Sequence, residues 1–377
     1  MNRQKFVDWL VIAIFLICIF GTTTIPQLWE KTTYIAPLYI FVALSILFLN
    51  HISLKECFYT KDREFFLMSG GILLSGINII LIHSRIGAFF TIADFLLLLY
   101  LANKIYFQKI QLGVFSAICF FILFYWLFIN KTDYLTSSFN PNGVSIILLI
   151  YFCVSVCYLT YLISSHFRFP KWGYYVAVFL SLIPLTIRVL SFHCRGVLLG
   201  ILVWALTYFI LPKKKYTIYL VIGTSLLMPM LYVLLWKSDM LEGLTFLGKR
   251  IASGRDIIWY EFFQAFIQHP ITGIGSDFER MVPDLYLKEV HHSLLDLLFV
   301  HGTPVFLIVL YLLYKRISEI ITNASEFVKA TCLASIYGLI TAGSLENYYI
   351  VSPFNILFLT IFIISNTASQ EQQITER

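Results

Sequence analysis

"GVSIILLIYFCVSVCYLTYLIS", residues 143–164, is an apolar stretch without a charged residue. A helix needs about 20 mostly apolar residues to cross a lipid bilayer, so this stretch predicts a membrane-spanning helix. The rest of the chain has the same character, because 59% of its 377 residues are hydrophobic and only 13% are charged. Soluble domains carry about 25% charged residues. The composition therefore predicts a polytopic membrane protein.

Further apolar stretches accompany this one, and together they predict an all-α protein with about twelve transmembrane helices. Lysine and arginine gather in every second short loop, which places both termini in the cytoplasm under the positive-inside rule. The net charge of +6 is therefore a topology signal and gives no indication of nucleic-acid binding. The polar tail from Ser365 to Arg377 is expected to be disordered. The expected spans are residues 8–23, 34–50, 65–83, 87–106, 111–129, 143–164, 173–192, 195–211, 216–236, 293–314, 327–345 and 348–365.

One connection is far longer than the others. Residues 237–292 lie on the external side, between the ninth and tenth expected spans. They divide the chain into residues 1–236 with nine transmembrane helices, the external segment, and residues 293–377 with three helices and a cytoplasmic tail. Long loops in compact proteins are usually functional, so the external segment is expected to carry catalytic residues.

Within this segment, apolar residues recur at helical spacing. Ile258, Phe262 and Phe266 fall on one stripe, and Pro270 follows them. The pattern predicts an amphipathic helix that the proline ends, followed by a glycine turn at "TGIGSDF".

Four arginines on the external side are candidates for holding an anionic ligand. Arg188 and Arg195 lie at the ends of the seventh and eighth expected spans, and Arg250 and Arg255 lie in the external segment. A guanidinium group suits bidentate binding of phosphate. The alternative for Arg188 is an interfacial charge that reaches toward water, and for the two segment arginines it is an ordinary solvated position.

Two adjacent histidines, His291 and His292, stand where the tenth expected span begins. A neutral imidazole accepts a proton from a hydroxyl near neutral pH, so each is a candidate general base. Glu346 is either a counter-ion for an arginine or an interfacial residue, and Asn140 belongs to a turn signal before the sixth span. His301 is expected to be a core histidine bonded to another helix. No cysteine pair has zinc-site spacing in the sequence, so neither a metal site nor a cofactor is expected.

Arginines beside a general base on the outer face suggest that an anionic group is held at the lipid surface. A lipid-linked diphosphate fits this description, because the arginines would neutralise its charge and make it a leaving group. A hydroxyl deprotonated by His291 would then attack the carbon that carries the diphosphate.

Several motifs resemble those of the bacterial O-antigen polymerase and O-antigen ligase superfamily of multi-spanning glycosyltransferases. The resemblance covers about residues 185–350, and the N-terminal half is similar only in hydropathy. Its motifs are "HCRGVLLG" (193–200), "GRDIIWYEFFQAFIQHPITGIGSDF" (254–278) and "HHSLLDLLFVHG" (291–302), with "FNPNG" (139–143) and "SLENYYI" (344–350) also similar.

The resemblance implies roles for individual residues. Arg195 and Arg255 would bind the diphosphate. The family pattern H-[NSQ]-x9-G, counted back from Gly302, places the catalytic histidine at His291 and puts His292 where Asn, Ser or Gln usually stands. The alternative takes His292 as the catalytic histidine, with one residue fewer before the glycine.

The resemblance also implies a GT-C-like fold and a metal-independent, inverting transfer of glycan from undecaprenyl diphosphate. The site would face the periplasm in a bacterial inner membrane. The implied partners are an undecaprenyl-diphosphate-linked glycan, an acceptor glycolipid, membrane lipids and a chain-length regulator.

Three functions are compatible with these features. The sequence slightly favours a polymerase, which joins the glycan to a lipid-linked repeat unit. The first alternative is a ligase, which moves the glycan onto lipid A-core. The second is a transporter or flippase, which would place polar groups near the bilayer midplane in two corresponding halves, whereas here they gather on the external side.

Overall fold

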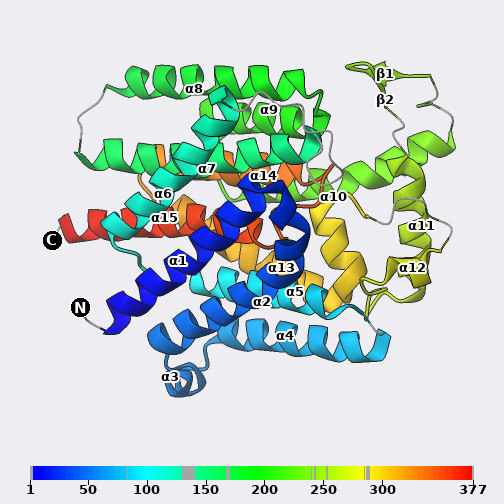
Figure 1. Cartoon of the computed structure of the whole chain (residues 1–377), viewed down its shortest axis with the longest axis horizontal. Coiled ribbons are helices and arrows are strands. Elements are labelled where there is room, and N and C mark those ends of the chain that lie inside the picture. The colour runs from blue at the N-terminus through cyan, green and yellow to red at the C-terminus, as the bar shows by residue number, and fades with distance from the viewer. Residues whose placement is uncertain are drawn as a thin grey trace.

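The computed structural model describes residues 3–82, 84–129, 141–166, 170–238, 240–241, 243–251, 254–283, 285 and 289–375, without the side chains of 26–34, 165–166, 171, 249–250 and 372–375. Long helices run side by side (Figure 1). The short elements within residues 245–281, called the module below, lie at one end of them (Figure 1). The long helices are α1 (Arg3–Thr24), α2 (Pro26–His51), α4 (Arg63–Ile82), α5 (Ile86–Leu101), α6 (Lys109–Phe124), α7 (Pro141–His166), α8 (Lys171–Ser191), α9 (Arg195–Phe209), α10 (Tyr216–Lys237), α13 (Ser293–Asn323), α14 (Glu326–Ala342) and α15 (Phe354–Thr375). The short helix α3 (Leu54–Tyr59) joins α2 to α4, and a π-helical turn, η1 (Tyr125–Ile129), extends α6.

Every expected span overlaps one of these helices, which confirms the all-α polytopic class. Within the described residues, seven helices are long and apolar enough to cross a membrane, namely α1, α4, α6 with η1, α7, α8, α10 and α13. The apolar part of α2, together with α5 and α9, forms shorter apolar helices. Twelve spans therefore remain a prediction, while the membrane class is established.

The structure corrects three expected boundaries near the C-terminus. Helix α13 runs on to Asn323 because its last turns carry paired charges, and α15 begins only at Phe354, after Pro353. The tail expected to be disordered continues α15 to Thr375. Its Thr367 hydroxyl donates to the Ile363 carbonyl at 2.9 Å, so polar side chains are satisfied by their own helix.

Two glycines bring α9 and α14 into close contact at the centre of the bundle. A Cβ on Gly200 would lie 2.7 Å from the Gly338 carbonyl oxygen, and a Cβ on Gly338 would lie 2.9 Å from the Gly200 oxygen. Small residues at a crossing allow membrane helices to approach closely. The crossing fixes the N-terminal end of α9, which carries Arg195, against the loop that follows α14.

The external segment folds into a hairpin and two helices. Strands β1 (Thr245–Phe246) and β2 (Lys249–Arg250) pair antiparallel. The hairpin was not expected from the sequence, although Leu247 and Gly248 both have positive φ, as a two-residue hairpin turn requires. Helix α11 (Arg255–Gln268) confirms the expected amphipathic helix and is followed by α12 (Phe278–Met281).

The module packs on α13 through its own small apolar core. Trp259 and Phe262 of α11 are fully buried there with Phe299 of α13, and the Trp259 indole donates to the Val290 carbonyl at 2.7 Å. The buried stripe of α11 thus sets the position of its first residue, Arg255, relative to the start of α13.

Two motif glycines clamp the turn after α11 onto α13. Gly273 and Gly302 have φ of 76° and 78°, and a Cβ on Gly273 would lie 2.7 Å from the Gly302 nitrogen. At this kink the Ile274 amide donates to the Phe299 carbonyl at 2.7 Å, and the Thr303 amide donates to the Pro270 carbonyl at 3.0 Å. The glycine motifs are therefore explained by backbone-to-backbone packing.

Gly302→Ala is expected to destabilise the protein by more than about 2 kcal/mol, because the substitution adds left-handed backbone strain to a clash with the Ile271 backbone. Gly223→Ala is the matched control, since a Cβ there meets nothing within 4 Å. It should be neutral or gain up to about 1 kcal/mol. Unfolding of the purified protein in detergent measures both, and equal stability of the two variants would contradict the clamp.

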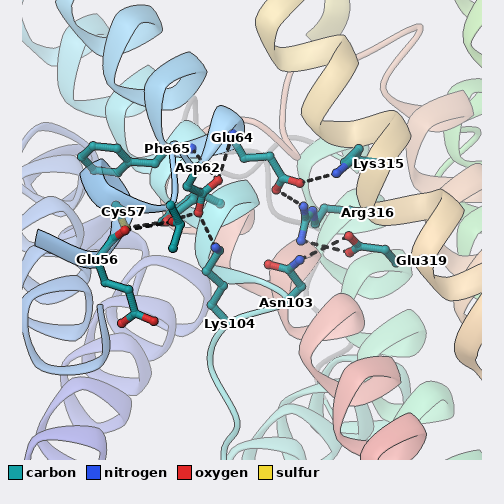
Figure 2. Close-up of polar contacts among 12 residues, drawn as sticks. Glu56, Cys57, Asp62, Glu64, Phe65, Asn103, Lys104, Lys315, Arg316 and Glu319 are labelled. Carbon is teal, nitrogen blue, oxygen red and sulfur yellow. Dashed lines mark hydrogen bonds and ion pairs between the residues drawn. The ribbon is translucent and has the colours of Figure 1, made fainter. Parts of the chain in front are cut away.

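The two ends of the helix bundle differ in the features that they carry, namely the module at one end and the termini at the other. Both termini lie at the end opposite α11 and α12 (Figure 1). Away from the module, Lys315 donates to Glu64 at 2.6 Å, Lys104 to Asp62 at 2.6 Å, and Arg316 pairs with Glu319 at 2.9 Å (Figure 2). The sequence places this end of the bundle in the cytoplasm and the module on the external side, and this orientation stays a prediction.

Candidate functional site

A cavity of about 580 Å³ lies between the module and the bundle, where α7, α9, α11 and α13 begin. Each helix N-terminus carries a partial positive charge from its unpaired amides. Four such ends at one cavity favour an anionic ligand. The polar residues around it are Asn142, His193, Cys194, Arg195, Arg255, His291 and Glu346, and the apolar ones are Leu199, Met228, Tyr232, Phe246, Ile251, Ile258 and Leu345.

Glu346 is the centre of the polar network. Arg255 donates through Nη2 to Glu346 Oε1 at 2.7 Å, and Asn142 donates to the same oxygen at 2.9 Å. The other oxygen, Oε2, lies 3.5 Å from His291 Nδ1. The Arg255 and Glu346 side chains are only 16% and 12% exposed, so this charge pair is weakly screened. Glu346 is thus the counter-ion of Arg255.

The loop after α14 is fixed against the start of α13, and this positions Glu346 beside His291. The Ser293 amide donates to the Gly343 carbonyl at 2.7 Å. The Ser293 hydroxyl donates to the Glu346 carbonyl at 3.2 Å and accepts from the Tyr348 amide at 3.2 Å. Residues of two motifs that are separated in the chain by the length of α13 and α14 therefore meet through Ser293.

The two adjacent histidines have different environments. His291 lines the cavity, with φ of 50° and with Glu289 Oε2 also 3.5 Å from its Nδ1. His292 is fully buried, and both of its ring nitrogens are engaged: Nδ1 accepts from the Leu295 amide at 3.1 Å and Nε2 lies 2.9 Å from the Ser225 carbonyl. Burial lowers the pKa of His292 to about 4.

His292 is the N-cap residue of α13. An N-cap side chain accepts a hydrogen bond from an unpaired amide of the first turn, and short polar residues such as Asn and Ser do this well. The place that the resemblance assigns to Asn, Ser or Gln is therefore a capping position. The geometry leaves His291, and not His292, facing the cavity.

Arg195 and its neighbours form another part of the cavity lining. Arg195 is the first residue of α9, and Cys194 is its N-cap. Burial raises the pKa of the Cys194 thiol to about 11, which favours the neutral thiol. A Cβ on Gly196 would lie 3.0 Å from Leu345 Cβ. The glycine thus allows α9 to approach the residue that precedes Glu346.

Three candidates from the sequence are not placed at the cavity. Arg188 is absent from its lining, and the Arg188 guanidinium lies 4.6 Å above the Phe192 ring. The geometry therefore does not support Arg188 as a diphosphate ligand. The side chain of Arg250 and all of Asn140 lie outside the described residues.

Sequence reasoning missed Asn142 and the apolar wall. Asn142 stands two residues after Asn140 in "FNPNG" and lies in the first turn of α7. This motif was the signal in the sequence that could have identified Asn142. His301 fulfils its expectation as a core histidine, because its Nδ1 lies 3.1 Å from the Ser75 hydroxyl of α4. Among the described residues no group of three or more His, Cys, Asp or Glu side chains could hold a metal ion.

Comparison with known families gives one match. A family model described as O-antigen ligase matches residues 176–310, which include Arg195, Arg255 and His291. Searches of curated proteins and of solved structures found no match. The match implies a glycosyltransferase-like activity of the O-antigen ligase or polymerase type. The match over this region supports the resemblance of the chain, a multi-pass membrane protein, to the O-antigen ligase and polymerase superfamily.

Proposed function

We propose that this protein transfers a glycan from undecaprenyl diphosphate to an acceptor hydroxyl at the periplasmic face of a bacterial inner membrane. The observation that carries the proposal is the network Arg255–Glu346–His291, which lines one cavity with Arg195. A cationic wall and a general-base candidate share that cavity, as displacement of an anionic leaving group requires.

In the proposed reaction, Arg195 and Arg255 bind the diphosphate. Glu346 holds the proton of His291 on Nδ1, which leaves Nε2 to accept the proton of the acceptor hydroxyl. The acceptor oxygen forms a bond to the anomeric carbon from the face opposite the diphosphate. The bond from that carbon to the diphosphate oxygen breaks, its electron pair stays on the diphosphate, and the configuration inverts. The guanidinium groups stabilise the leaving group, so the reaction as proposed needs no metal ion.

The acceptor distinguishes two forms of the reaction. We propose a polymerase, whose acceptor is a second lipid-linked repeat unit, with a chain-length regulator as its partner. The second candidate is a ligase, whose acceptor is lipid A-core, and the description of the matching family model favours it. The GT-C-like architecture and cytoplasmic termini belong to the same proposal.

Reconstitution in vesicles tests this proposal. Purified protein receives undecaprenyl-diphosphate-linked repeat units, and lipid A-core is added in a second reaction. Longer lipid-linked glycans in the first reaction support the polymerase, and transfer only to the core supports the ligase. Movement of the lipid across the bilayer without any transfer would instead support a transporter and contradict the proposal.

Glu346→Gln is expected to lower kcat by about 10²-fold, because the neutral amide no longer stabilises the protonated His291. KM for the donor should change little. If Glu346 served only to neutralise Arg255, the same variant would bind the diphosphate more tightly, with a lower KM and unchanged kcat. Steady-state kinetics of the reconstituted protein separate these results.

Glu289→Gln is the matched control for this prediction. Its carboxylate also lies 3.5 Å from His291 Nδ1 but is 70% exposed, so water screens its charge. The control should retain kcat within about threefold. Equal losses in the two variants would mean that burial of the carboxylate is unimportant and would contradict the role given to Glu346.

A further inference from the structure

The cavity has an apolar part that the proposed chemistry does not use. Leu199 of α9 and Met228 and Tyr232 of α10 line it, on helices that both pack against α14. A diphosphate and a sugar would not need such a wall. The apolar lining therefore calls for an apolar portion of a ligand.

This apolar wall continues into the surface that faces lipid. Leu199 is 38% exposed, and Leu202 and Leu206 follow it at helical spacing with 54% and 36% exposed. On α10, Leu227 and Leu231 are each 57% exposed. Exposed leucines on apolar helices of a membrane protein suit contact with lipid chains, so a leucine stripe leads from the cavity lining along the surface of α9.

The β1–β2 hairpin region contributes to the same cavity lining. Phe246 of β1 and Ile251 line the cavity, although 55% of Phe246 is exposed. The hairpin begins only a few residues after the end of α10, so it stands close to the membrane surface. An aromatic residue half in the cavity and half outside suits an amphipathic ligand that leaves the site at this point.

We propose that the isoprenoid chain of the donor leaves the cavity between α9 and α10, beneath Phe246, and reaches the outer leaflet along Leu199. This inference rests on the proposed function, because it needs a donor whose diphosphate lies at Arg195 and Arg255. It adds the occupant of the apolar wall, namely the first isoprene units of the lipid. The wall thereby selects lipid-linked donors over free sugar diphosphates.

Leu199→Trp, which fills the space between the two helices, tests the inference. It should raise the KM of an undecaprenyl-linked donor about tenfold, with kcat unchanged. The KM of a donor whose diphosphate carries a methyl group in place of the lipid should stay at the wild-type value. Ile187→Trp on α8 is the control, because Ile187 is 62% exposed and does not line the cavity. Phe246→Ser, on the exposed hairpin, should likewise raise only the KM of the undecaprenyl-linked donor, without a change inside the bundle.

A binding measurement keeps the inference separate from the proposed reaction. Benzophenone side chains at positions 199 and 187 are irradiated with undecaprenyl diphosphate in vesicles. Cross-linking at position 199 well above position 187 is expected, and equal cross-linking would overturn the inference. Equal KM changes for the undecaprenyl-linked donor and the methyl donor would also overturn it. A wild type that transfers from neither donor would sink the proposed function alone, since the cross-linking still decides the lipid route.

Discussion

His291→Ala is expected to lower glycan transfer by about 10²–10⁴-fold, the usual contribution of a general base. The reason is geometric, since His291 is the histidine of the pair that lines the cavity and has its Nδ1 beside Glu346. Without the imidazole, the group proposed to take the proton from the acceptor hydroxyl is lost. Donor binding should persist, so the loss should appear in kcat and leave KM for the donor nearly unchanged.

His292→Asn is the control that separates the two histidines. Asparagine caps helices well and can accept from the Leu295 amide as His292 does, so this variant should fold and keep transfer within about tenfold of wild type. Rates of the two variants in the reconstitution assay decide the question. Wild-type transfer by His291→Ala, together with loss in His292→Asn, would move the base to His292.

Arg195→Ala is expected to lower transfer by about 10²–10³-fold, as removal of one oriented donor to developing charge typically does. Arg195 is the cleaner test of diphosphate binding, because removing Arg255 would also take away the arginine that pairs with Glu346. Arg195→Lys should fail as well, since an ammonium cannot reproduce the two parallel hydrogen bonds of a guanidinium. The readout is the rate of transfer at saturating donor.

Arg188→Ala is the matched control. Arg188 is close to Arg195 in the chain, carries the same charge and belongs to the preceding helix, but it does not line the cavity. This variant should transfer at nearly the wild-type rate. A loss as large as that of Arg195→Ala would show that the general positive charge of this face is sufficient and that the cavity geometry is irrelevant.

Local patterns in the sequence determined much of this protein. Apolar stretches of the required length marked the long helices, and the stripe of Ile258 and Phe262 marked α11, because hydropathy and the 3.6-residue period act within one helix. The same reasoning selected the charged and titratable residues on the external side as candidates, among them Arg195, Arg255 and His291. This reasoning did not predict the β1–β2 hairpin, which depends on the turn at Leu247 and Gly248. It also did not predict that the polar tail is helical, where side chains such as Thr367 bond to their own helix.

Only the tertiary structure decided which of those charges share a cavity. Arg255 and Glu346 are 91 residues apart in the chain, and His292 caps a helix while its neighbour His291 faces the cavity. No local pattern encodes such differences, because they arise from the Gly200–Gly338 crossing, the Gly273–Gly302 clamp and the Ser293 bridge. Close backbone packing between distant segments sets the position of each side chain to within a hydrogen-bond length, and the chemistry of the site depends on that length.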